Sequence, residues 1–78
     1  MSGGGENAEK LTRMANQIAA FFKSYPEATA VEGVREHVAK FWTRGMRAAI
    51  VAEARRPDNG LDPAVVKAVA LLKESQPA

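Results

Sequence analysis

The side chains that could catalyse a reaction are few in this chain. It holds one histidine, His37, no cysteine, and serines only at positions 2, 24 and 75. Nucleophilic catalysis needs an activated Ser, Cys or Lys beside a base that a third group orients. The outer two serines lie in terminal stretches without a pattern to bury, and nothing marks Ser24 as paired with His37. We therefore expect no catalytic site in this chain.

Metal and cofactor sites are equally poorly provided for. The absence of cysteine excludes disulfides and thiolate-ligated metals, and a single histidine excludes a His-rich site. The run Gly3-Gly4-Gly5 is not followed by the Lys-Ser/Thr pair of a phosphate-binding loop. We expect this chain to bind no metal and no cofactor of its own.

Size and charge narrow the function further. The 78 residues carry a net charge of +2, with 11 basic and 9 acidic side chains spread along the chain. A chain this short is only marginally stabilised by its own core and usually needs a disulfide, a metal or a partner. No apolar run approaches the roughly 20 residues that span a bilayer, and the start lacks the pattern of a signal peptide. A cytoplasmic protein is expected, stabilised either by a partner or by good packing alone.

The elements that must position any functional residue are helices, because Ala is abundant and strand-like alternation does not occur. We expect an all-α fold: a small domain of three to four short helices, either compact or extended against a partner subunit. The predicted organisation is an N-terminal flexible tail, one helical domain and a C-terminal flexible tail, at residues 1–6, 7–74 and 75–78.

Local signals place the helices. The first should run from about Asn7 to Ser24, before Tyr25-Pro26. A capping box, Thr29-x-x-Glu32, predicts the start of the second. Thr43 is expected to cap a third helix over about 44–56, and Asp62 followed by Pro63 should begin a fourth after the turn PDNG. The predicted buried stripes consist of Leu11, Met14, Ala15, Ile18, Phe21, Phe22 and Tyr25; Val31, Val34, Val38, Phe41 and Trp42; Met46, Ile50, Val51 and Ala54; and Val65, Val66, Val69 and Leu72.

The polar side of the first helix admits two interpretations. Arg13, Asn16 and Gln17 lie opposite the apolar stripe, as on any solvated helix face. Compact hydrogen-bonding groups on a smooth Ala-rich surface also suit a face that contacts another protein. The pattern alone leaves both open.

Three residues of the second and third helices raise similar questions. His37 lies at the edge of the apolar stripe, where it would be a boundary residue with one wet nitrogen or an interface hydrogen-bonding group. Arg47 projects into an apolar arc, so it either extends its head to water or pairs with a carbonyl or carboxylate. Gly33 weakens its helix by about 0.5–1 kcal/mol relative to Ala unless a close neighbour needs the space.

The second half of the chain is locally basic, which raises an alternative function. Its basic residues, with Trp42 among them, are Lys40, Arg44, Arg47, Arg55 and Arg56. A small helical nucleic-acid-binding regulator could use such a patch. Against it, Glu53 interrupts the patch, and alanines occupy positions where base-reading side chains would be needed. A solvated face or a charged rim against a protein is favoured.

Three segments together resemble one family. KLTRMANQIAAFF at 10–22, HVAKFWTRGMR at 37–47 and GLDP at 60–63 are similar to the delta subunit of the soluble, molybdenum- or tungsten-dependent, NAD-linked formate dehydrogenases of bacteria. The likeness covers about residues 10–70. One departure is that this family often has a proline after the tryptophan, whereas this chain continues Thr43-Arg44-Gly45.

The resemblance implies a non-catalytic accessory subunit. Its partner would be the catalytic alpha subunit, within a complex that also contains beta and gamma subunits. That complex would carry a molybdenum or tungsten bis-pterin centre, iron–sulfur clusters, FMN and NAD, and the delta subunit would support assembly, stability or cofactor insertion. Neither a membrane nor nucleic acid is implied as a partner. The residues that we predict to contact the partner are Arg13, Asn16, Gln17, His37, Lys40, Trp42 and Arg47.

Overall fold

Four helices make up the described part of the chain. In this computed structural model the backbone is described for residues 8–75 and the side chains for residues 8–72. Within this range no strand forms, so the expectation of an all-α fold is confirmed. The tails expected at 1–6 and 75–78 fall outside the described residues, Ser75 excepted. The helices are α1 (Ala8–Phe21), α2 (Glu27–Phe41), α3 (Arg44–Ala54) and α4 (Pro63–Ser75).

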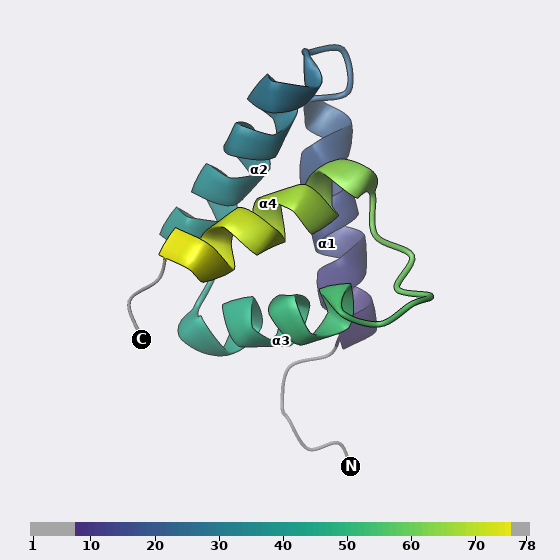
Figure 1. Cartoon of the computed structure of the whole chain (residues 1–78), viewed down its shortest axis with the longest axis vertical. Coiled ribbons are helices and arrows are strands. Elements are labelled where there is room, and N and C mark those ends of the chain that lie inside the picture. The colour runs from purple at the N-terminus through teal and green to yellow at the C-terminus, as the bar shows by residue number, and fades with distance from the viewer. Residues whose placement is uncertain (1–7, 76–78) are drawn as a thin grey trace.

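The helices pack against one another rather than lying in an extended row. In Figure 1, α1 and α2 form a hairpin that is closed at its connecting loop and open at its other end. α4 crosses this hairpin and makes its most extensive contact with α2, while α3 lies across the open end and packs mainly on α1. Of the two arrangements that the sequence allowed, compact and extended, the compact one forms, because all four helices share one apolar core.

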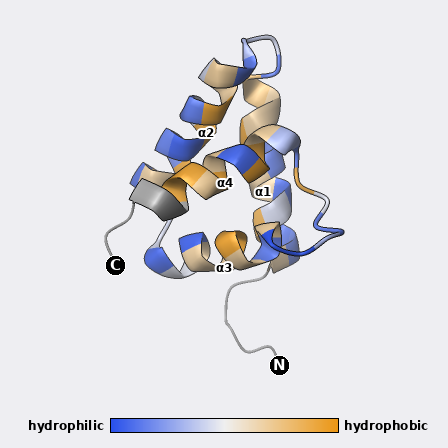
Figure 2. Cartoon of the chain, in the orientation of Figure 1, coloured by the Kyte–Doolittle hydropathy of each residue, from blue (hydrophilic) through white to orange (hydrophobic). Residues whose placement is uncertain are grey.

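The core consists mainly of small and β-branched side chains. In Figure 2, much of α4 has the colours of hydrophobic residues where this helix crosses α2 and α1. α1 contributes Leu11 and two alanines, and Ile50 is the buried residue of α3. Burial of these side chains supplies the main stabilising free energy of the fold. The buried cluster is Leu11, Ala15, Ala19, Val31, Val34, Val38, Trp42, Ile50, Val65, Ala68, Val69 and Leu72.

Three aromatic residues that the stripes predicted to be buried are exposed instead. Phe21 and Phe41 are each 70% exposed, and Tyr25 is 50% exposed. Phe21 lies about 120° around α1 from Ala15, so it points away from the side that α3 and α4 cover. Phe41 is the last residue of α2, where α1 has diverged from it (Figure 1), and Trp42 takes the core position instead.

The start of α2 also differs from the prediction. Thr29 and Glu32 form no capping box, because α2 begins at Glu27, three residues before the start that a cap at Thr29 implies. The carbonyl of Pro26 accepts the first helical hydrogen bond, from the amide of Ala30, at 3.0 Å. With its φ already fixed at −56°, Pro26 begins the helix without a side-chain cap. The Glu32 carboxylate is used in an ion pair with Arg35.

The caps of the last two helices are confirmed. The Thr43 hydroxyl accepts a hydrogen bond from the amide of Met46 at 3.1 Å, so this residue starts α3 despite the missing proline. The Asp62 carboxylate accepts from the amide of Ala64 at 2.9 Å, directly before the first turn of α4. Two helices end earlier than expected. α1 ends at Phe21 rather than Ser24, because the next amides bond to carbonyls three residues back instead of four. α3 ends at Ala54 rather than Arg56.

A close contact between Phe22 and Gly33 joins α1 to α2. A Cβ atom placed on Gly33 would lie only 2.3 Å from Cζ of the Phe22 ring. The ring therefore lies directly on the backbone of α2, in space that any other residue would occupy. The sequence allowed that a close neighbour would justify this glycine, and the neighbour is Phe22.

We predict that Gly33→Ala lowers the free energy of unfolding by about 1–2 kcal/mol, because displacement of the Phe22 ring outweighs the gain in helix propensity. Urea unfolding of the full chain measures this value. In a Phe22→Ala background the ring is gone, so the same Gly33→Ala change should be neutral or stabilising. Equal effects in both backgrounds would show that the ring does not need this space.

Candidate functional site

An open groove runs between α1 and α2. Its volume is about 1080 Å³, and its walls come from these two helices and the first residue after each of them. The apolar floor includes Met14, Ile18 and Phe22, which pack partly against the core. The other lining residues are Gln17, Phe21, Ala28, Thr29, Glu32, Gly33, Glu36, His37, Lys40, Phe41 and Trp42.

Aromatic rings dominate the exposed part of this groove. Phe21 stands on the α1 wall and Phe41 on the α2 wall. The Phe21 ring packs edge-to-face on Phe22 at 5.0 Å between centroids, and Phe22 packs on Tyr25 at 5.6 Å. On the other wall the rings of His37 and Phe41 are 4.9 Å apart. These contacts hold the rings in place while leaving most of Phe21 and Phe41 in water, which is typical of binding surfaces rather than of folding cores.

Charged residues follow the α2 wall at intervals of one turn. Glu32, Glu36 and Lys40 are four residues apart and line the groove together. Lys40 Nζ lies 3.3 Å from a Glu36 oxygen, and both side chains are more than half exposed. Arg35, outside the groove, donates to both oxygens of Glu32. This hydrogen bond from Arg35 holds the pKa of the Glu32 carboxyl below its ordinary value.

Several of the residues predicted to contact a partner meet at this groove. Gln17, His37 and Lys40 are exposed and line it. Arg13 is exposed on α1 but does not line the groove. Contact of these four residues with a partner stays a prediction, and the structure shows that their side chains are available for it.

Asn16 has a role within the chain. Its side-chain amide donates to the carbonyl of Gly60 at 3.0 Å, and its oxygen accepts from the amide of Asp62 at 2.8 Å. The nitrogen and the oxygen of this one side-chain amide therefore both tie α1 to the segment before α4. A sequence pattern cannot show this, because the partners are 44 and 46 positions away.

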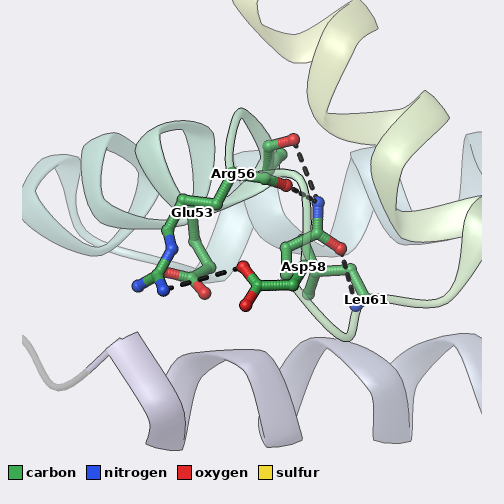
Figure 3. A network of polar contacts seen from close by, with 6 residues as sticks. Glu53, Arg56, Asp58 and Leu61 are labelled. Carbon is green, nitrogen blue, oxygen red and sulfur yellow. Dashed lines mark hydrogen bonds and ion pairs between the residues drawn. The ribbon is translucent and has the colours of Figure 1, made fainter.

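The segment that Asn16 holds is itself ordered by hydrogen bonds (Figure 3). The Asn59 side chain donates to the carbonyls of Ala54 and Arg56, and its oxygen accepts from the amide of Leu61. Gly60 has a φ of +72°, a conformation that disfavours side chains and explains the glycine in the PDNG turn. The entry to α4 is thus fixed at both Asn59 and Asn16.

Trp42 and Arg47 are also used within the chain. Trp42 is 5% exposed and belongs to the core, although it also lines the groove. Arg47 is half-buried, and its Nη1 donates to the Trp42 carbonyl at 2.7 Å. The partner that an arginine in an apolar arc requires is therefore a backbone carbonyl of the same chain. Its buried Nε forms no hydrogen bond among the described residues.

Phe21 and Phe41 are the site residues that sequence reasoning missed. The adjacent pair Phe21-Phe22 offered a signal, since neighbours on a helix are about 100° apart and cannot both face one narrow core. Phe41-Trp42 poses the same conflict at the end of α2. In each pair both rings line the groove, but the second packs against the core and the first is 70% exposed.

Other kinds of site find little support in residues 8–72. No group of three His, Asp or Glu side chains is placed to hold a metal ion, and no described helix could cross a membrane. Within the basic patch, Arg56 pairs with Glu53 and Asp58, each at 3.7 Å, as Figure 3 shows for Asp58. Lys40 pairs with Glu36, so the patch is not an unopposed basic stripe.

The fold and this groove describe a small all-α chain with an open groove between α1 and α2 that is lined partly by exposed aromatic rings. Comparison with known families identifies it further. The family model of the NADH-dependent formate dehydrogenase delta subunit, FdsD, matches residues 10–69. The chain belongs to this family, in agreement with the resemblance of its three sequence segments. Comparisons with curated proteins and with solved structures find no match.

Substitution should lower the stability of the chain at Asn16 but leave it nearly unchanged at the neighbouring Gln17. Asn16→Ala should lower the free energy of unfolding by about 1–3 kcal/mol, because it leaves backbone groups of Gly60 and Asp62 without partners. Gln17→Ala should leave stability within about 0.5 kcal/mol, as expected of an exposed side chain. Urea denaturation of both variants tests the assignment, and equal losses at the two positions would contradict it.

Proposed function

We propose that this chain is the non-catalytic accessory subunit of a bacterial NAD-dependent formate dehydrogenase complex. It docks on the catalytic alpha subunit, in a complex with beta and gamma subunits, and supports assembly, stability or cofactor insertion of the alpha subunit. The molybdenum or tungsten bis-pterin, iron–sulfur clusters, FMN and NAD belong to the other subunits. The proposed location is the cytoplasm.

The observation that carries this proposal is the pair of exposed phenylalanines on one groove. Phe21 and Phe41 are 70% exposed although the chain is short of large core residues. Leaving two such rings in water forgoes roughly 1.5–3 kcal/mol each of burial free energy. A partner that covers them recovers this free energy, and aromatic residues are enriched at the centres of protein interfaces.

Binding of this kind also accounts for the small size of the chain. A partner that binds only the folded form adds its binding free energy to the stability of that form. The relation is reciprocal, so the same contact stabilises the surface of the alpha subunit on which the chain docks. An accessory subunit can therefore act without any catalytic group.

We expect the tagged chain, expressed together with its alpha, beta and gamma subunits, to co-purify with all three. Leaving this chain out should lower formate-dependent NAD⁺ reduction, because the alpha subunit is then less stable or incompletely loaded. Two measurements separate these roles. The first is the metal content of the alpha subunit, and the second is the recovery of activity when the purified chain is added back. Recovery on addition indicates stabilisation, whereas low metal content without recovery indicates cofactor insertion.

The matched control is the same purification with an unrelated helical protein carrying the same tag. A chain that purifies alone at every salt concentration, and whose omission changes neither activity nor metal content, would refute the proposed function.

A further inference from the structure

We propose that the groove between α1 and α2 binds an amphipathic α-helix of the partner subunit, held between Phe21 and Phe41. This helix presents an apolar stripe to the groove floor, a basic residue to Glu32 and Glu36, and an acidic residue to Lys40. The inference rests on the proposed function, and it names the kind of segment that the partner supplies.

The shape of the groove favours a helix as its occupant. Two diverging helices form the walls, and the floor between them is apolar, which is the arrangement in which grooves bind amphipathic helices. On α2 the lining extends from Ala28 to Trp42, about 21 Å at 1.5 Å per residue. About four turns of a partner helix would fill that length. A helix also satisfies its own backbone groups, which an apolar floor cannot do for an extended strand.

The charges along α2 give the occupant a direction. Two carboxylates, Glu32 and Glu36, precede one ammonium, Lys40, so the wall changes sign along its length. Glu32 and Lys40 are eight residues apart, about 12 Å along the helix axis. A partner helix with a basic and an acidic residue about two turns apart on one side matches this wall, and the reverse orientation places like charges together. Such complementarity sets orientation more than affinity.

Other parts of this chain are poor occupants of the groove. Residues 1–7 and 76–78, MSGGGEN and QPA, contain a single large apolar side chain, Met1. A second copy offers no suitable helix either. Among the described residues its exposed large hydrophobic side chains are Phe21, Tyr25, Phe41 and Leu71, and no helix carries an apolar stripe of them. A different polypeptide is required.

Site-specific photo-crosslinking in the assembled complex tests the location. A photoreactive phenylalanine analogue replaces Phe21 or Phe41, and Leu71, which is 42% exposed on α4 outside the groove, serves as the control position. We expect both groove positions to crosslink to one alpha-subunit segment with helical apolar spacing, and the control to give none there. Crosslinks only from position 71, to a second copy of this chain, or to a segment without that spacing would overturn the proposal.

Matched substitutions test the contribution of the rings. Phe21→Ser and Phe41→Ser should each weaken binding to the alpha subunit at least about tenfold, as expected of interface aromatic anchors. Leu71→Ser should change binding less than about twofold, as expected of residues outside the contact. Circular dichroism of each free variant checks that helicity is kept. Unchanged affinity in both Phe variants would refute the groove while leaving the proposed function intact, whereas a wild-type chain that does not bind refutes the function itself.

A charge swap tests the direction of the bound helix. The double variant Glu36→Lys with Lys40→Glu keeps the net charge and an ion pair one turn apart. It moves the positive charge from position 40 to position 36, so the wall reads carboxylate, ammonium, carboxylate and no longer matches the partner helix. We expect weaker binding to the alpha subunit, and recovery when the acidic and basic residues of the crosslinked segment are exchanged as well. Wild-type affinity in the double variant would show that charge does not orient the occupant.

Discussion

The contact of the Phe22 ring with Gly33 determines how the rest of the structure is arranged. Because Gly33 has no side chain, the ring lies on the backbone of α2 and joins the two helices near their connecting loop. From this point α1 and α2 diverge, which leaves one face for α3 and α4 to cover and another as the open groove. The same ring packs edge-to-face on Phe21, so the contact that closes the hairpin also positions a wall of the site.

The molecule divides its apolar side chains between two uses. The core on α1 consists of Leu11 and two alanines, which allow close packing but bury little area each. The large rings of Phe21 and Phe41 lie in the groove instead. A chain that placed these rings in its core would be more stable alone and would have less to offer a partner. This distribution agrees with the proposed docking on a partner that binds the folded form.

The sequence correctly predicted helix caps, which depend on residues close by in the chain. It did not reveal contacts between residues that are far apart in the chain. Thr43 and Asp62 were identified as caps because a cap acts within three residues. Pro26 overrode the capping box at Thr29, a competition between two local signals that a pattern does not rank. Asn16 was interpreted as a surface residue because nothing nearby reveals its bonds to Gly60 and Asp62. The groove was likewise missed, since an apolar arc does not show how much of its width neighbouring helices will cover.

The position of α4 has a consequence for when this chain becomes able to fold. Its residues Val65, Val69 and Leu72 complete the core against α2, and Asn16 finds its partners only at the entry to α4. During synthesis the ribosome has therefore released α1, α2 and α3 before their contacts with α4 can form. Contacts between such distant segments slow folding and leave apolar surface open in the meantime. The nascent hairpin carries its exposed rings, Phe21 and Phe41, throughout this interval.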